Sequence, residues 1–278
     1  MKITRIGVPV KEGCCISGAD KAISALQTSG MVFDEVIEVR PQPEDNPRMH
    51  YLNTIIDLDV RLRKAVLRAH DNGNFPLIFG GDHSLAIGSI GALDNSERAV
   101  LWIDAHGDCN TDMTTESKRI HGMPLAVLQG HGADQLTAII EKNFVASKNI
   151  LLVGIRSLDI EEEKLMHSWG LHWITMDETR NEGMNVTLEK ITKFVSEHPA
   201  LHVSFDCDST DPQLFPGVST AVQGGFTMDE ALSIVNVAFD HGSVNSMDIV
   251  EFNPYNDNGA TMRLVYALDK YVAKRKEG

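Results

Sequence analysis

The sequence lacks any hydrophobic run long enough to cross a membrane. Its 278 residues are 42% hydrophobic, yet no stretch of eighteen apolar residues occurs, and the first residues do not resemble an export signal. Cysteine is scarce: Cys14 and Cys15 are adjacent, while Cys109 and Cys207 stand alone, which is not the spacing of a disulfide framework. We therefore expect a cytoplasmic protein, because thiols stay reduced there.

Positive charge is also in short supply. Lysine and arginine number 25 against 39 aspartates and glutamates, which gives a formal net charge of −14. Nucleic acids and anionic lipids bind clustered positive charge. This balance argues against nucleic acid or a membrane as a partner and favours a small-molecule substrate.

Short apolar segments alternate with amphipathic ones along the chain. The strand-like segments are Ile3–Val8, Phe75–Phe79, Ala99–Ile103, Ile150–Val153, His202–Phe205 and Val244–Val250. The segments with apolar residues three and four apart are Asp57–His70, Met123–Leu128, Leu188–Glu197, Met228–Phe239 and Thr261–Ala273. This alternation predicts an α/β fold: a single domain over residues 1–278, built as a three-layer αβα sandwich with a mostly parallel sheet.

Parallel sheets bind ligands beyond the carboxyl ends of their strands, and one strand end here is rich in ligands. Ala99–Ile103 leads into the sequence DAHGD. In extended chain Asp104, His106 and Asp108 point to one side, with small residues between them. Two carboxylates that close take up protons unless a cation neutralises them. The pattern indicates a metal site; a solvated loop is the alternative.

Three more strand ends carry polar residues. His202–Phe205 leads into Asp206 and Asp208, which again share a face, and Phe75–Phe79 leads into GGDHS with His83. A single histidine is more often a structural residue, so His83 alone is a weak signal. Val244–Val250 leads into Glu251, which alone is equally consistent with a surface residue or a substrate ligand.

Together these segments supply four carboxylates and two imidazoles as candidate metal ligands: His83, Asp104, His106, Asp108, Asp206 and Asp208. Two ions that share bridging carboxylates would use the whole set. Mn²⁺ suits such a carboxylate-rich set, whereas structural zinc prefers thiolates, although zinc, iron and cobalt remain open. Cys109 and Cys207 alternate away from the ligands, so we expect both in the core.

These motifs make the sequence resemble the ureohydrolases, the family of arginase, agmatinase and formiminoglutamase. GGDHS at 80–84, DAHGD at 104–108 and SFDCDSTDP at 204–212 occur in the family order, and the resemblance covers nearly the whole chain. It is greatest to arginases, because residues 104–130 keep their spacing from the metal motif to His121. The resemblance implies hydrolysis of L-arginine to L-ornithine and urea, with two Mn²⁺ ions per subunit, in a homo-oligomer that is a trimer or hexamer.

The resemblance also implies roles for individual residues. One ion would be held by His83, Asp104, Asp108 and Asp206, and the other by Asp104, His106, Asp206 and Asp208. The substrate contacts would be Asn110 and Ser117 on the α-carboxylate, Asp159 on the α-amino group, and Thr220 and Glu251 at the guanidinium. Asp108 would pass a proton to the departing amine, and His121 would exchange protons with bulk water.

The sequence departs from the arginase pattern in the loop that recognises the amino acid. Lys118 and Arg119 stand where arginases usually have Gly-Asn, and Ser-Thr-Ala at 219–221 replaces Gly-Thr-Pro. The two charges either bind a carboxylate, on arginine or another substrate, or point to solvent. Agmatinase, formiminoglutamase or another amidino hydrolase is therefore the alternative, but agmatine has no α-carboxylate, so the presence of Asn110 and Ser117 favours arginine. A non-catalytic metal-binding relative is a third reading, which the complete ligand set argues against.

Overall fold

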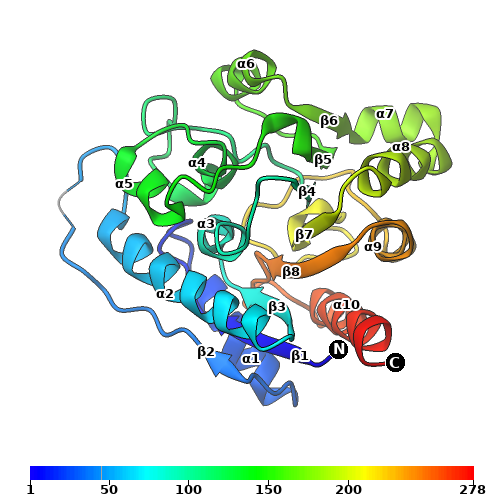
Figure 1. Ribbon diagram of the computed structural model, residues 1–278, viewed down its shortest axis with the longest axis horizontal. Coiled ribbons are helices and arrows are strands. Elements are labelled where there is room, and N and C mark those ends of the chain that lie inside the picture. The colour runs from blue at the N-terminus through cyan, green and yellow to red at the C-terminus, as the bar shows by residue number, and fades with distance from the viewer. Residues whose placement is uncertain (45) are drawn as a thin grey trace.

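The computed structural model describes residues 1–44 and 46–278 and places eight strands in one sheet (Figure 1). Their order is β2-β1-β3-β8-β7-β4-β5-β6, and each neighbouring pair is parallel. The strands are β1 (Ile3–Val8), β2 (Glu35–Val36), β3 (Phe75–Gly80), β4 (Arg98–Ile103), β5 (Ile150–Ile155), β6 (His172–Thr175), β7 (Ala200–Asp206) and β8 (Val244–Val250).

Helices cover both faces of this sheet, so the predicted three-layer α/β architecture is confirmed (Figure 1). One apolar layer packs under α2 (Leu52–Asp71), α3 (Ala86–Ile90), α4 (Pro124–Leu128), α5 (Asp134–Thr137) and α6 (Ile160–Trp169). The other packs under α1 (Ala22–Thr28), α7 (Met176–Glu182), α8 (Met184–Ser196), α9 (Met228–His241) and α10 (Ala260–Glu277). None of the helices in the described residues is long and apolar enough to span a bilayer.

The local sequence explains why these elements form. The strands β3, β4 and β5 are buried along their whole length, as expected for parallel strands covered on both faces. Helix α2 buries Leu58, Leu62 and Val66, which recur every four residues. Thr175 and Thr227 begin α7 and α9 with capping boxes that satisfy the first free N–H groups of each helix.

All six predicted strands are present, and the two that the sequence missed lie at the sheet edges. β2 has only two residues, and β6 reads His-Trp-Ile-Thr with a half-exposed pattern. Helix α6 was also missed, because its sequence IEEEKLMHSW buries only Glu162 and Met166. Weak burial leaves weak periodicity, so these elements give little signal.

The strand order brings the candidate ligands together. β3, β8, β7 and β4 are consecutive neighbours and all run the same way, so their carboxyl ends lie side by side. The four segments that follow them are those with His83, Glu251, Asp206 and Asp104. The sheet therefore gathers residues up to 168 positions apart at one edge.

One buried carboxylate lies away from that edge. Asp59, in the middle of α2, is fully buried, and neither of its oxygens has a hydrogen-bond partner among residues 1–44 and 46–278. Burial and the negative charge of Asp82 raise the pKa of Asp59 well above its usual value. The folded protein therefore binds a proton at Asp59 over a pH range where the unfolded chain releases it.

This linkage predicts a pH-dependent penalty that Asp59→Asn removes. Because the folded pKa is raised, stability is lost as pH rises from the unfolded pKa toward the folded one, by up to about 1.4 kcal/mol per pH unit. We expect the free energy of unfolding of Asp59→Asn, measured by urea denaturation from pH 4 to 8, to fall less steeply with pH than that of the wild type. The matched control is Asp71→Asn, at an exposed carboxylate of the same helix. Parallel pH curves for Asp59→Asn and wild type would show that Asp59 carries no such linkage.

Candidate active site

Three strands of this edge, β3, β4 and β7, lead into an aspartate that turns the chain. In each case Oδ1 accepts a hydrogen bond from the N–H two residues later: Asp82 from Ser84 (3.0 Å), Asp104 from His106 (2.7 Å) and Asp206 from Asp208 (2.7 Å). Such Asx turns bend the backbone at a strand end. The repeated turn delivers His83, His106 and Asp208 toward the same space.

The prediction that Asp104, His106 and Asp108, and likewise Asp206 and Asp208, align through extended chain was therefore wrong in its mechanism. β4 stops at Ile103, and Asp108 has a left-handed backbone with φ +49°. Asp208 lies in a 3₁₀ turn over Cys207–Ser209. The side chains still converge, because turns rather than alternation direct them. Cys109 and Cys207 are buried free thiols in opposite apolar layers, as predicted.

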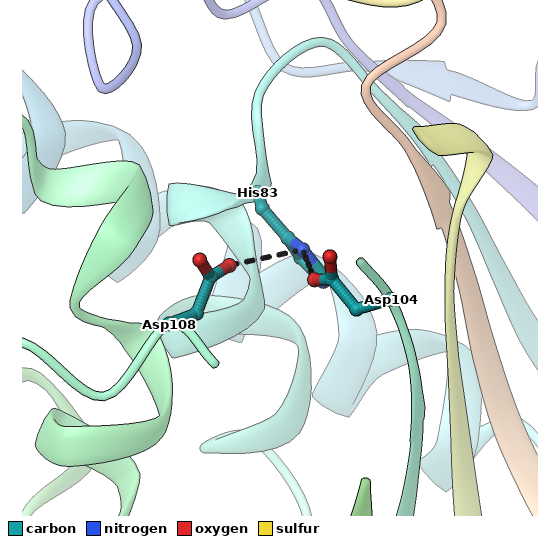
Figure 2. A group of neighbouring side chains, drawn as sticks. All are labelled: His83, Asp104 and Asp108. Atoms are coloured by element: carbon teal, nitrogen blue, oxygen red, sulfur yellow. Dashed lines mark ion pairs between the residues drawn. The ribbon is translucent and has the colours of Figure 1, made fainter. Parts of the chain in front are cut away.

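His83 is surrounded by three carboxylates, two of which, those of Asp104 and Asp108, are drawn in Figure 2. Its Nδ1 lies 3.0 Å from Asp206 Oδ2, 3.1 Å from Asp104 Oδ2 and 3.3 Å from Asp108 Oδ2. Among the described residues, this nitrogen forms a hydrogen bond with none of them. Ligands of an octahedral cation with bonds of about 2.1 Å lie about 3.0 Å apart, so the four atoms have the spacing of a coordination shell.

A second cluster shares Asp104 with the first. His106 Nδ1 lies 3.1 Å from Asp208 Oδ2 and 3.5 Å from Asp104 Oδ1. Asp104 thus presents one oxygen to each histidine, which is the arrangement of a bridging carboxylate. His106 is a quarter exposed, whereas the acids are buried, so the second cluster faces the pocket.

The electrostatics of this edge favour a cation. Burial, Asp208 and Asp104 raise the pKa of Asp206 well above its usual value, and burial with Asp104 raises that of Asp108 to about 6. Burial opposes ionisation of Asp104 too, but His106 and His83 hold its pKa below the usual range. Four carboxylates against two imidazoles leave excess negative charge away from water. Oxygen and imidazole donors at this spacing fit divalent cations.

Trp102 contacts two of the candidate ligands, His83 and the shared Asp104. Its indole stacks on the His83 ring, with centroids 3.9 Å apart and an interplanar angle of 8°, and Nε1 donates to Asp104 Oδ2 at 2.9 Å. The sequence analysis treated Trp102 as a strand residue only. The signal was its position two residues before Asp104, on the same face of the strand.

Glu251 lies beside the clusters in a strained conformation. Its φ is +59°, unusual for a residue with a side chain, and its N–H donates to Gly81 O at 2.6 Å. Oε1 accepts a hydrogen bond from the backbone N–H of His83 at 3.0 Å and lies 3.1 Å from His121 Nδ1. Oε2 is buried without a partner in the described chain, and Glu251 lines the pocket. An unpaired carboxylate oxygen at a pocket wall is suited to a cationic ligand.

The predicted substrate-binding residues line the same pocket. They are Asn110, Ser117, Asp159 and Thr220, together with His106, Asp108, His121 and Glu251. Asn110 Nδ2 donates to Asp159 Oδ2 at 3.1 Å, and Thr220 Oγ1 donates to Asp208 Oδ2 at 2.8 Å. Asp159 is exposed and begins α6, where Glu162 reaches back to its N–H at 3.3 Å.

The two charged residues of the recognition loop lie outside this lining. Lys118 Nζ donates to the Pro47 carbonyl at 2.9 Å, and His50 N–H donates to the Lys118 carbonyl at 2.9 Å. Lys118 has φ +60°, a conformation that glycine adopts without strain. Arg119 is not among the residues that line the pocket either. The loop is thus fastened to the segment at 47–50 rather than to the candidate metal ligands.

Two further residues of the site were not identified from the sequence. Glu162 lines the pocket and accepts the Cys109 N–H at 2.8 Å, and burial raises its pKa to about 7. Arg156 donates to backbone carbonyls of two segments, among them Asp208 O at 2.7 Å and Val222 O at 2.8 Å. Arg156 therefore ties the segment that carries Asp208 to the one that carries Thr220. The Asp159-x-x-Glu162 spacing is a capping-box pattern that could have located the start of α6. No local pattern predicts the contacts of Glu162 with Cys109 or of Arg156 with Val222, because these partners are distant in sequence.

Comparison with known proteins agrees with this fold. The Arginase family model matches residues 44–272. The chain is 36% identical to the arginase of Staphylococcus aureus (strain MRSA252) over 274 residues, 91% of this chain and 90% of that protein. The arginase structure from Bacillus caldovelox matches with a TM-score of 0.90 and 33% identity over 96% of both chains. The Entamoeba histolytica arginase structure in complex with L-ornithine matches with a TM-score of 0.87 and 29% identity over 96% of this chain and 97% of that one.

The parallel sheet and these relatives define an enzyme of the ureohydrolase class. More narrowly, the chain belongs to the arginase family.

The contacts of Arg156 predict that Arg156→Lys destabilises the fold. A lysine keeps the charge but has three donors on one nitrogen and cannot span both segments, so buried carbonyls lose partners at about 1–3 kcal/mol. We expect the free energy of unfolding of the metal-free protein to fall by about that amount in urea denaturation. Arg180→Lys is the matched control, because Arg180 forms a more exposed pair with Glu230, which is worth about 0–1 kcal/mol. Equal effects of the two substitutions would contradict the bracing role of Arg156.

Proposed function

We propose that this chain hydrolyses L-arginine to L-ornithine and urea, using two Mn²⁺ ions. One observation carries the proposal. Apart from Asp59, the described residues contain two buried polar side-chain atoms without a hydrogen-bond partner, His83 Nδ1 and Glu251 Oε2. One lies among carboxylates at metal-ligand spacing, and the other belongs to a carboxylate in the pocket wall. A pair of cations and a guanidinium would satisfy them.

We assign the six ligands to two ion positions. The first position comprises His83, Asp104, Asp108 and Asp206, and the second comprises Asp104, His106, Asp206 and Asp208. The distances around His83 and His106, with Asp104 between them, support this division. When bound, two such cations supply a nucleophile by lowering the pKa of water toward neutrality.

Glu251 is suited to orient the guanidinium. Its Oε1 is engaged by the His83 N–H and by His121, which leaves Oε2 to accept a charge-assisted hydrogen bond from the substrate. The positive φ of Glu251 and its bond to Gly81 fix the direction of the carboxylate. A fixed carboxylate places the guanidinium carbon over the ligand clusters, which lowers the entropy lost on reaching the transition state.

Asp108 and His121 are placed to handle protons. Asp108 turns Oδ2 toward His83, so Oδ1 can accept a proton from attacking water and pass it to the departing amine. His121 lines the pocket and contacts Glu251. Burial lowers the pKa of His121, but Glu251, Asp108 and Asp82 raise it overall, so His121 can hold a proton near neutral pH and exchange it with solvent.

The pocket mouth favours an amino acid as substrate. Asn110 and Ser117 offer polar groups for an α-carboxylate, and Asp159 offers a carboxylate for an α-amino group. The Entamoeba relative was solved with L-ornithine, an amino acid with both groups. Lys118 and Arg119 lie outside the pocket lining, so the site need not recognise a second substrate carboxylate. The homo-oligomer (trimer or hexamer) stays a prediction from the family resemblance, and the cytoplasmic location stays a prediction from the spacing of the cysteines.

A substrate panel tests the proposed function. We expect metal-stripped protein reloaded with Mn²⁺ to release urea from L-arginine with a kcat/KM at least about 100-fold above that for agmatine, because agmatine loses its hydrogen bonds to a charged group at about 1.5–3 kcal/mol each. Guanidinobutyrate and formiminoglutamate complete the panel. His106→Ala is the matched inactive variant, which should abolish turnover and lower the Mn²⁺ content. Preference for any other substrate rejects the arginine assignment, and Mn²⁺ binding without turnover of any substrate would identify a non-catalytic relative.

The role of Glu251 predicts a separation of metal binding from substrate binding. Glu251→Gln keeps the shape of the side chain but removes its charge, so we expect kcat/KM for arginine to fall by about 100-fold or more, mainly through KM, while two Mn²⁺ ions remain bound. Steady-state kinetics and elemental analysis of the same sample check both statements. An unchanged KM would remove Glu251 from substrate recognition.

A further inference from the structure

A buried polar network of hydrogen-bonded side chains extends from His83 into the apolar layer under α3. His83 Nε2 lies 2.8 Å from Ser204 Oγ, and Ser204 Oγ donates to Asp248 Oδ1 at 2.5 Å. On the other side, Asp248 Oδ2 lies 3.0 Å from His202 Nε2. Beyond that ring, His202 Nδ1 lies 3.1 Å from a terminal nitrogen of Arg98. Every residue of this polar network is at most 1% exposed.

The pairing register of β7 and β8 brings the side chains of this polar network together. His202 pairs with Ser246 across β7 and β8, and Ser204 pairs with Asp248, so the four side chains lie on one face of the sheet. Ser246 Oγ lies 2.7 Å from His202 Nδ1 and accepts a hydrogen bond from Arg98. Residues at alternate positions of a central parallel strand are normally apolar, so this polar strip opposes the burial pattern of the sheet.

The donors and acceptors of the polar network determine where its protons lie. A guanidinium only donates, so His202 Nδ1 accepts from Arg98 and the ring proton is on Nε2, facing Asp248. Asp248 also accepts from Ser89 at 2.6 Å and from Ser204. The single proton of Ser204 is thereby committed, so Ser204 Oγ accepts from His83 Nε2–H. Nδ1 of His83 is then the nitrogen with a free lone pair.

Charge balance explains why Arg98 is part of the polar network. Arg98 is buried, and its other hydrogen bonds go to neutral groups: Ile90 O, Asn95 Oδ1, Asn245 Oδ1 and Ser246 Oγ. Burial lowers the pKa of Arg98 to about 9, so it remains a cation near neutral pH. Burial would raise the pKa of Asp248, but His202 and its other partners bring it below the usual value. The imidazole of His202 thus lies between a buried cation and a buried anion.

We propose that Asp248, held by His202 and Arg98, is a positioning residue that orients His83 with Nδ1 toward Asp104, Asp108 and Asp206, and so sets the affinity of the first ion position. This inference rests on the proposed metal pair. A histidine ligand needs its second nitrogen held by an acceptor, and loss of such partners weakens metal binding about 10- to 100-fold. Here the acceptor is a serine whose own proton is directed by Asp248.

The first test replaces the carboxylate by its neutral isostere. Asp248→Asn should raise the Mn²⁺ concentration for half-saturation of metal-free protein about 10- to 100-fold, measured by calorimetry, for one of two ions. At saturating Mn²⁺ we expect kcat to recover and KM for arginine to stay unchanged. Asp59→Asn is the control for an Asp-to-Asn substitution in the same buried layer, at a side chain that forms no hydrogen bond with His83. It should bind Mn²⁺ as the wild type does.

The second test separates positioning from stability. Asp248→Asn alone leaves Arg98 as an unbalanced buried cation and should lower the melting temperature of metal-free protein. Adding Arg98→Gln removes that charge and keeps an amide donor, so the double variant should recover part of the lost thermal stability and still bind Mn²⁺ weakly. Recovery of both properties together would show that Asp248 acts through stability alone and overturn the proposal. If Asp248→Asn does not fold, Ser204→Ala, which deletes one hydroxyl, should give the same loss of Mn²⁺ affinity.

The outcomes also distinguish this proposal from the proposed function. Wild-type protein that binds two Mn²⁺ ions but hydrolyses nothing contradicts the function and leaves the affinity comparison decisive. Wild-type affinity in both Asp248→Asn and Ser204→Ala, with urea released normally, contradicts the positioning role alone. A wild-type protein that binds no Mn²⁺ contradicts both.

Discussion

The main constraint on this structure is the mutual repulsion of four carboxylates, which the fold holds close together. Asp104, Asp108, Asp206 and Asp208 are buried at one edge of the sheet, and only two imidazoles lie among them. Such a cluster is unfavourable unless cations join it, because water cannot screen the charges. The surrounding structure serves to hold the ligands at this spacing: the strand order, the three Asx turns, the stacking of Trp102 and the bonds of Arg156. Bound cations would offset the free energy that this cluster costs.

Two carboxylate residues of the site have a strained backbone. Asp108 and Glu251 have positive φ values of +49° and +59°, although neither is glycine. Each is held by contacts of its backbone: the Asp108 carbonyl accepts from Leu125 N–H at 3.0 Å, and Glu251 N–H donates to Gly81 O. Strained residues of this kind persist only where neighbouring structure determines their conformation. The strain at Asp108 and Glu251 fixes the direction of two carboxylates that a relaxed backbone would leave variable.

The sequence was sufficient to predict the parallel α/β fold and the group of acidic and histidine side chains that cluster, since both depend on local patterns. Apolar segments predicted β1, β3, β4, β5, β7 and β8, and the motifs that follow β3, β4 and β7 contain the residues that the structure clusters. The path of the chain between Asp104 and Asp108 was beyond such reasoning, because a turn and an extended segment can share the same spacing. The contacts of Glu162 with Cys109 and of Arg156 with Val222 were missed for another reason: these partners are 53 and 66 residues away. For Asp248 a signal existed, since Ser246 and Asp248 repeat the alternation of His202 and Ser204 within otherwise apolar strands.

The placement of these interactions separates metal binding from substrate recognition. The candidate ligands follow the strand ends. They are supported from within the sheet by Trp102 and by the polar network from Ser204 to Arg98. The recognition loop is fastened elsewhere, through Lys118, to the segment at 47–50. The two sets of supports share no residue. Lys118 and Arg119, in place of Gly-Asn, lie outside the pocket lining, so this change leaves the carboxylates of the two clusters where they are. A loop that is supported independently of the carboxylates can change its sequence at little energetic cost to them.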